Sequence, residues 1–458
     1  MKKVQAGALI FGLFLFVSGC GGGGGDSCNR FAQTGCDSGK VCEEVQGGTT
    51  GCFDPILVRG MVTNFATGAA IPNARVVALD ANRSPISTVA TTDASGNYEM
   101  TLYAARASDG TPVAADFTLR ADAAGYQTFP AGVRQPIPIN TSSAVAAQVV
   151  IKSLVVDSVL TDIGLIALEA GAGTAAIHGK AELTDTISGV LVVAESSPTA
   201  GFSAIADRTG DYKIFNLPAG NYTVNGYAQN ANYAPGAVTL ADGQDATVDL
   251  TLNEQAVGAV AGTVQIVNAP GGSKTSVILV VESTFDENLA RGEMPPGLRM
   301  PDVSGAYQID GVTSGRYVVL AAFENDGLVR DPDLSIGGTS ILHILVQDGQ
   351  TTNVDGFKVT AALEILSPGA NGPEGVPAAP TLSWVDDSSE DSYHITVFDT
   401  FGTIVWEADE PKHTGDNPAV AYGGPLVPGM YYQFRVTSIK DGVPISQTED
   451  LKGVFYVQ

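Results

Sequence analysis

The sequence predicts an all-β protein made of tandem β-sandwich modules that follow a small disulfide-stapled N-terminal segment. Three observations predict this fold class. The chain is rich in Gly (54) and Pro (24), and only 16% of its residues are charged, a composition typical of extracellular β-rich proteins. Short segments in which apolar and polar residues alternate are separated by turns that contain Gly, Pro and Asp. Finally, the same turn motifs recur along the chain.

The N-terminus predicts export and membrane attachment. Lys2 and Lys3 precede an uncharged, mostly apolar stretch over residues 6–17, which is typical of a secretory signal peptide over residues 1–19. The run Val17-Ser18-Gly19-Cys20 resembles the lipobox of bacterial lipoproteins, with Val17 in place of the usual Leu. The resemblance implies cleavage before Cys20 and lipidation of its thiol.

An ordinary signal peptide or a short transmembrane anchor is the alternative, but the apolar run is shorter than the ~18–20 residues needed to span a bilayer. In a cell with two membranes, Gly21 in place of an aspartate favours sorting to the outer membrane. We therefore expect an outer-membrane lipoprotein that faces the periplasm or the cell surface, with no later spanning helix.

Two short segments connect the lipidation site to the body of the chain. Residues 20–27 contain five consecutive glycines and form a flexible tether. Residues 28–55 contain Cys28, Cys36, Cys42 and Cys52, and an even cluster of cysteines in an exported chain predicts disulfides. Three connectivities are open. A zinc site is the weaker alternative, because the cluster has no C-x-x-C pair.

Residues 56–366 contain the repeats. Gly210-Asp211-Tyr212 leads to Leu217-Pro218-Ala219-Gly220-Asn221-Tyr222, and 95 residues later Gly305-Ala306-Tyr307 leads to Gly315-Arg316-Tyr317. A partial copy surrounds Tyr98. Each copy opens with a strand centred on a glycine. We therefore expect three modules, over residues 56–172, 173–255 and 256–366. Three aspartates are placed to cap the turns before the glycines: Asp93, Asp207 and Asp302.

These motifs resemble carboxypeptidase regulatory-like domains. The resemblance rests on the opening G-x-V strand, on Ile71-Pro72-Asn73-Ala74 and on the D-x-x-G-x-Y and L-P-A-G-x-Y turns. It implies a transthyretin-like β-sandwich of seven strands for each module. The third copy departs most, with an insertion over residues 284–300. Some starch-binding modules share this sandwich, so the resemblance also implies carbohydrate binding as an alternative function.

The C-terminal module, over residues 373–458, resembles a fibronectin type III domain. Trp384 matches the core tryptophan of that family. Tyr432 lies at the L-x-P-x-x-x-Y position of a tyrosine corner. The segment 367–373 is rich in Gly and Pro and is the predicted linker.

The sequence offers little catalytic chemistry. The four histidines are His178, His343, His394 and His413; they are far apart in sequence, and no familiar hydrolase motif accompanies them. We expect no enzyme activity and no cofactor. Asp386–Asp391 is a weak candidate for calcium because it lacks the spacing of an EF-hand loop. Tyr227, Tyr233 and Phe202, if exposed, would be able to stack on sugars.

These observations predict a non-catalytic, lipid-anchored protein of the cell envelope that acts as a scaffold, stalk or adhesion module. The alternative is a carbohydrate-binding lipoprotein that holds extracellular glycan near the cell. The expected partners are the membrane, through the lipid anchor, and a glycan or another envelope protein. A net charge of −25 excludes nucleic acid as a partner.

Overall fold

The computed structural model describes residues 28–148, 152–184, 187, 189–322, 326–333 and 340–457. The predicted signal peptide, Cys20 and the tether lie outside the described residues. The described chain consists of β-strands, turns and two short 3-10 helices, Thr141–Ser143 and Glu282–Thr284, and contains no α-helix. The predicted all-β fold class is confirmed. Within this part of the chain, no helix has the length and hydropathy that crossing a bilayer requires.

The first sandwich is built around the long opening strand β3 (Ile56–Asn64). Strand β6 pairs with β3 antiparallel, and β10 and β11 pair with it in parallel at its two ends. A second sheet with the order β5-β4-β7-β8 packs against the first, and apolar residues from both sheets form one core. The remaining bounds are β4 Arg75–Leu79, β5 Ala90–Thr91, β6 Asn97–Leu102, β7 Asp116–Asp122, β8 Ile139–Asn140, β9 Val145–Gln148, β10 Lys152–Asp157 and β11 Ile163–Leu165.

The second sandwich repeats this pairing. Its opening strand β12 pairs antiparallel with β15 and parallel with β19, and the facing sheet has the order β14-β13-β16-β18. The bounds are β12 Ala175–Lys180, β13 Val190–Ser197, β14 Ala200–Ala206, β15 Asp211–Leu217, β16 Gly220–Tyr227, β17 Asn232–Tyr233, β18 Gly236–Leu240, β19 Asp245–Thr247 and β20 Leu252–Asn253.

The third sandwich repeats it again. Strand β21 pairs antiparallel with β24 and parallel with β28 and β29, opposite a sheet with the order β23-β22-β25-β27. The repeated turn motifs in the sequence therefore correspond to a repeated strand pairing. The bounds are β21 Gly258–Ile266, β22 Thr275–Val281, β23 Arg299–Val303, β24 Ala306–Val312, β25 Gly315–Ala321, β26 Leu328–Arg330, β27 Leu342–Val346, β28 Thr351–Asn353 and β29 Phe357–Ala361.

A glycine and a tyrosine from neighbouring strands fit together in each of these sandwiches. The Tyr98 hydroxyl crosses Gly60 and donates to the Thr161 carbonyl at 2.6 Å. The Tyr212 hydroxyl crosses Gly179 in the same way and donates to the carbonyl of Val248. A Cβ at Gly60 would lie 2.2 Å from the Thr161 oxygen, so only glycine leaves room for the loop that the tyrosine binds.

The third copy keeps this packing but loses the hydrogen bond. Tyr307 lies beside Gly262, where a Cβ would be 2.6 Å from its hydroxyl, yet that buried hydroxyl has no hydrogen-bond partner. The capping prediction also fails in this copy. Asp302 lies within β23 at a φ of +58°, and Gly305 does not have the positive φ of Gly96 and Gly210.

The caps of the first two copies form as predicted. The Asp93 carboxylate accepts the amides of Ser95 and Asn97, at 2.8 and 2.9 Å, and Asp207 accepts the amide of Thr209 at 2.8 Å. The tyrosines of the second motif also have matching roles. Tyr222 donates to the Pro218 carbonyl at 2.8 Å, and Tyr317 donates to the carbonyl of Thr313 at 2.7 Å.

The C-terminal sandwich packs a sheet of order β30-β32-β35 against a six-stranded sheet that contains β33, β34, β36 and β38. Trp384 is fully buried in its core, and the Tyr432 hydroxyl accepts the Val427 amide at 2.9 Å, as expected of a tyrosine corner. The bounds are β30 Ile365–Ser367, β31 Glu374–Val376, β32 Thr381–Trp384, β33 Ser392–Asp399, β34 Ile404–Pro411, β35 Ala419–Ala421, β36 Tyr431–Lys440, β37 Val443–Gln447 and β38 Val454–Val457.

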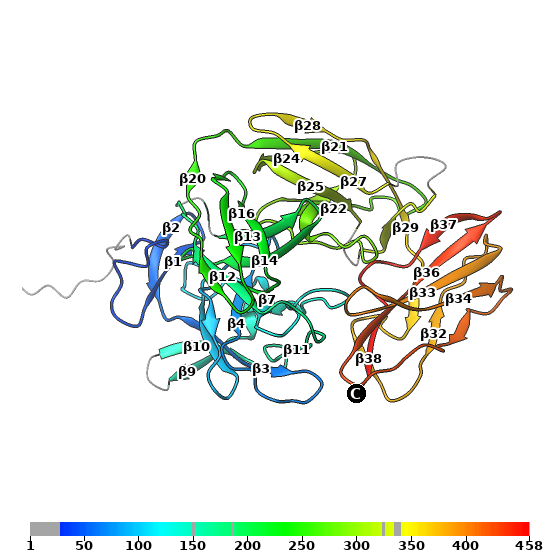
Figure 1. Ribbon diagram of the computed structural model, residues 1–458, viewed down its shortest axis with the longest axis horizontal. Helices are drawn as coiled ribbons and strands as arrows, with labels where there is room; N and C mark the ends of the chain where they lie inside the picture. Colours follow the sequence, from blue (N-terminus) through cyan, green and yellow to red (C-terminus); the bar gives the residue numbers. More distant parts are fainter. Residues whose placement is uncertain are drawn as a thin grey trace, which may run out of the picture.

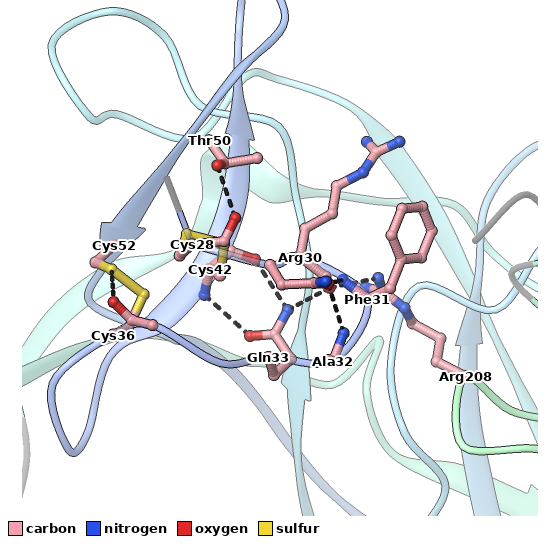
Figure 2. Close-up of a disulfide and its surroundings, with 12 residues drawn as sticks. Cys28, Arg30, Phe31, Ala32, Gln33, Cys36, Cys42, Thr50, Cys52 and Arg208 are labelled. Atoms are coloured by element: carbon pink, nitrogen blue, oxygen red, sulfur yellow. Dashed lines mark hydrogen bonds between the residues drawn. A yellow bond between two sulfur atoms is a disulfide. The ribbon is translucent and has the colours of Figure 1, made fainter. Parts of the chain in front are cut away.

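The N-terminal segment is a disulfide-stapled hairpin of β1 (Val41–Val45) and β2 (Thr49–Phe53). Of the three possible connectivities, the structure has Cys28–Cys42 and Cys36–Cys52. Figure 2 shows the amide of Gln33 bonded to both backbone groups of Cys42 beside these bridges. The segment does not stand free of the body, because its Glu43 forms an ion pair with Arg106 and both side chains are buried.

Replacement of Gly179 by Ala tests the glycine requirement of the opening strand. The new Cβ would lie 1.9 Å from the Val248 carbonyl oxygen, so the loop that follows β19 must move. We expect a loss of about 1–3 kcal/mol in the free energy of unfolding, measured by denaturant titration. Gly271→Ala is the matched control, because no atom lies within 4 Å of its Cβ position. Equal stability of the two variants would contradict the prediction.

Candidate functional site

The sandwiches are not arranged end to end. Figure 1 shows four groups of strands around a common centre, with β3 and β10 at the bottom, β13 and β16 to the left, β21 and β28 at the top and β33 and β36 to the right. One apolar cluster joins Leu79 of β4 and Leu191 of β13 to Val277 and Leu279 of β22. An apolar core therefore continues across the junctions of the first three sandwiches, and we take the junctions as the candidate functional region.

Arg120 on β7 lies at the junction of the first three sandwiches and is only 3% exposed. Its guanidinium binds both carboxylate oxygens of Asp122 in its own sandwich, at 3.0 and 3.2 Å. It also donates to the carbonyl and hydroxyl of Ser203 on β14, at 3.2 and 3.1 Å, and to Glu293 of the third sandwich, at 2.7 Å. A single buried cation therefore bonds to three sandwiches.

The charges of this group stabilise one another. Burial alone would lower the pKa of Arg120, but the carboxylates of Asp122 and Glu293 outweigh it and raise the pKa. Burial would raise the pKa of Glu293, but the guanidinium groups of Arg120 and Arg83 outweigh it and hold that pKa below its ordinary value of 4.5. Both partners are therefore charged at neutral pH.

The insertion of the third copy forms a second junction, with the first and fourth sandwiches. The Arg291 guanidinium donates to the carbonyls of Gly132 in the first sandwich and Asp450 in the fourth. In return, Arg435 of β36 donates to the carbonyl of Leu289 at 2.7 Å. The segment that departs most from the repeat thus holds the C-terminal sandwich in place.

A cavity of about 420 Å³ lies where these elements meet. Its walls come from the first sandwich, from the β14 strand of the second, from the insertion and β22 of the third, and from the turns around Thr400 and Asp450 of the fourth. Five arginines line it: Arg83, Arg120, Arg134, Arg291 and Arg299. Such a cationic concentration contrasts with the whole chain, which has 24 Lys and Arg residues against 49 Asp and Glu.

The structure does not bring the histidines together. They lie on β12, β27 and β33 and just after β34, and each is bonded to a different carboxylate: His178 to Asp245, His343 to Glu282, His394 to Asp409 and His413 to Glu410.

In the acidic loop over residues 386–391, three aspartates are engaged in hydrogen bonds, whereas both carboxylate oxygens of Glu390 are buried without a partner. Asp386 accepts the Tyr393 hydroxyl at 2.8 Å, Asp387 accepts the amide and hydroxyl of Ser389, and Asp391 accepts the Asp441 amide. Within the described ranges, the closely grouped sulfur or carboxylate ligands are those of Cys28, Cys36 and Cys52, whose sulfurs are engaged in disulfides. The weak calcium hypothesis gains no support.

The aromatic residues considered for sugar stacking do not form a platform. Tyr227 and Tyr233 are 4% and 6% exposed, and their hydroxyls donate to Glu195 and to the Glu182 carbonyl. Phe202 is half-buried and packs edge-on against Tyr222. The condition of exposure is not met for the two tyrosines, because the junction of the second and third sandwiches covers Tyr227, and the core of the second sandwich contains Tyr233.

Sequence reasoning missed Arg120, Arg291 and Glu293. A signal for Arg120 was available: it lies in the strand Phe117-Thr118-Leu119-Arg120-Ala121-Asp122, where a cation and an anion two residues apart share one face of the strand. Arg291 and Glu293 belong to the insertion, whose sequence carries no repeat pattern to compare with.

Comparisons with known proteins show no family membership. No protein-family description matches the chain, and no characterised protein matches its sequence. The resemblances to carboxypeptidase regulatory-like and fibronectin type III domains therefore remain predictions.

Solved structures give weak similarities. The Bacillus anthracis TIE protein is 12% identical with a TM-score of 0.16, over 84% of this chain and 66% of that one. BcpA, the major pilin subunit of Bacillus cereus, is 11% identical with a TM-score of 0.19, over 68% and 100% of the two chains. GBS52, the minor pilin of Streptococcus agalactiae, is 14% identical with a TM-score of 0.19, over 43% and 98%. TM-scores of this size do not establish a shared arrangement of modules.

Replacement of Arg120 by Met tests the first junction. The variant leaves the carboxylates of Asp122 and Glu293 without their buried cation, and removal of one partner from a buried ion pair costs about 3–5 kcal/mol. We expect a loss of that size in the free energy of unfolding. Arg59→Met is the control, because its pair with Glu99 is exposed and contributes about 1 kcal/mol or less. A loss at Arg120 no larger than that of the control would contradict the prediction.

Acidification tests the same junction through Glu293. A carboxylate with a lowered folded-state pKa stabilises the protein fully above its ordinary pKa of 4.5, and this stabilisation is lost as the pH falls through the folded-state value. We therefore expect the stability difference between the unaltered protein and Glu293→Gln to shrink as the pH is lowered from 7 to about 3. Denaturant unfolding at a series of pH values measures it, and a constant difference would disprove the expectation.

Proposed function

We propose that this protein is a non-catalytic, lipid-anchored scaffold or adhesion protein of the cell envelope. The observation that carries the proposal is the joining of the β-sandwiches into one body through buried charges and a continuous apolar cluster. Strands and turns make up this body, and the polar contacts of Arg120 and Arg291 hold its modules together. This is what a load-bearing surface protein requires.

The N-terminal segment supports the anchoring part of the proposal. It follows the predicted lipidation site and tether directly, and it is fixed to the first sandwich through the buried pair of Glu43 and Arg106. Arg106 also donates to the Asp54 carbonyl at 2.9 Å, and Arg208 of the second sandwich donates to the Arg30 carbonyl at 3.1 Å. A pull on the anchor would therefore reach the body through two disulfides and buried bonds.

The arrangement favours a scaffold or adhesion module over an extended stalk. A stalk gains reach when its modules follow one another in a row, whereas here the C-terminal sandwich contacts both the first and the third (Figure 1). The alternative of glycan binding is weakened, since the tyrosines on which it was based are buried.

Cell fractionation of a Cys20→Ala variant tests the anchor. The unaltered protein should sediment with membranes. In the variant, a leader for the general signal peptidase replaces residues 1–19, so that no uncleaved leader attaches the protein to the membrane. The variant should be soluble because it lacks acyl chains. The same leader with Cys20 replaced by Ser is a second non-lipidated form. An unaltered protein in the soluble fraction, or a variant that stays with membranes, would refute lipid anchoring.

The released protein then serves to separate the two functions. We expect no saturable sedimentation of the soluble form with insoluble polysaccharides or cell-wall material at physiological salt. Saturable binding to one glycan would support the carbohydrate-binding alternative in place of the scaffold.

A further inference from the structure

The cavity at the junction of the sandwiches has the features of a small-molecule site. Its volume of about 420 Å³ lies within the range of known ligand pockets, about 300–1,000 Å³. Separate elements converge on it, as is common for sites at domain interfaces. The insertion of the third copy and the turns of the first sandwich both contribute to it, so it exists only in the assembled body.

The cations of the cavity are not balanced by its carboxylates. Glu293 is bonded to Arg120, and Asp450 is paired with Arg435 and Arg330, which lie outside the lining. The other two acidic residues of the lining close their own turns: Asp80 accepts the amides of Asn82 and Ser84, and Asp286 those of Asn288 and Leu289.

Three of the arginines lack a carboxylate partner. The guanidinium of Arg83 forms no ion pair or hydrogen bond within the described chain, and the carboxylate that acts on it, Glu293, already binds Arg120. Arg134 is 8% exposed and lies over the rings of Phe129 and Tyr431, at 4.5 and 4.7 Å. Arg291 donates to backbone carbonyls alone, and its Nε is buried without a partner.

Arg134 is buried and Arg83 and Arg291 are partly buried, and such cations are costly without a counter-ion. Transfer of a charged group into a low-dielectric interior is unfavourable unless the group is paired. Burial accordingly lowers the pKa of Arg83 and of Arg134, and burial together with the neighbouring Arg435 lowers the pKa of Arg291 to about 9. An anion in the cavity would restore the balance.

One wall of the cavity is aliphatic, although Thr and Gln side chains also line it. Side chains from three sandwiches contribute to it: Leu79, Ile205, Ile278, Val280, Met294 and Leu320. An inorganic anion would leave these walls exposed to water. An apolar group would cover them and stabilise the complex by about 25 cal/mol for each Å² of apolar surface removed from water.

We propose that this cavity binds an amphipathic organic anion, with a carboxylate that pairs with Arg83 and Arg134 and an apolar body that covers the aliphatic wall. The ligand is defined by this chemistry, which a free organic acid and a fatty acid released from a membrane share. The site goes beyond the scaffold function and does not depend on the lipid anchor.

Isothermal titration calorimetry with octanoate tests the proposal, on the chain from residue 21 to residue 458, which contains every described residue. Octanol supplies the same apolar body without the charge, and inorganic phosphate supplies a charge without the body. We expect octanoate to bind and both comparison compounds to bind at least about tenfold more weakly, because a charge-assisted pair and the apolar burial each contribute. Longer saturated acids then distinguish the sources: a further gain in affinity indicates a lipid-derived acid, and a loss indicates a smaller free acid.

Arg83→Gln is the decisive variant. Residue 83 has a φ of +61°. Arg→Gln replaces one non-glycine side chain by another at this backbone angle, so the backbone strain is unchanged and the guanidinium charge is removed. We expect it to weaken octanoate binding about tenfold or more, and the unfolding midpoint is measured beside it to show that the variant is folded, since Arg83 forms no hydrogen bond or ion pair with another module. Arg59→Gln, far from the lining, is the matched control. Undiminished octanoate affinity in Arg83→Gln, equal affinity for phosphate, or absence of octanoate binding would overturn the proposal.

Discussion

The buried charge of Arg120 is the constraint on which the arrangement of the sandwiches depends. A guanidinium that is 3% exposed has to be paired wherever it lies, and its partners come from three sandwiches. Separation of the sandwiches would leave Glu293 without Arg120, and it would uncover the apolar cluster that joins β4, β13 and β22. The electrostatic and hydrophobic terms thus favour the same assembly, and the stability of each sandwich is coupled to its neighbours.

The repeat is conserved in its interior and altered at its junctions. The pairing of Gly60 with Tyr98 and of Gly179 with Tyr212 keeps the opening strand against its loop in the first two copies. Residues of the shared turns and of the insertion also contact other sandwiches. Asp207 caps its own turn with one oxygen and accepts the Val89 amide of the first sandwich with the other. The unrepeated insertion likewise supplies Arg291 to two sandwiches.

Local sequence patterns predicted the interior of each sandwich, and they could not predict the junctions. Alternation and turn motifs fix which strands pair, because those signals lie within a few residues of one another. Cysteine spacing predicted disulfides without choosing between Cys28–Cys42 and the other two pairings. The local sequence around Tyr227 does not indicate whether this side chain faces water or another module. It is buried because β25 lies beside it, with the ring centroids of Tyr227 and Tyr317 5.9 Å apart. The residues that line the cavity are up to 372 positions apart in the chain, from Leu79 to Leu451, so no local pattern unites them.

The use of the few cations explains both the outer surface and the cavity. The chain has 24 Lys and Arg residues, and several are withdrawn into junctions: Arg106, Arg120 and Arg134 are each less than 10% exposed. Acidic side chains are still in excess over the whole chain, 49 against 24, so the solvent-facing surface repels anions as they approach. Within the cavity the balance is reversed, because unpaired guanidinium groups lie beside aliphatic walls. A small hydrophilic anion meets the outer repulsion and stays better hydrated in water. An anion with an apolar body gains binding free energy from both the arginines and the aliphatic wall. The distribution of charge that repels polyanions from the surface therefore favours amphipathic acids at the junction.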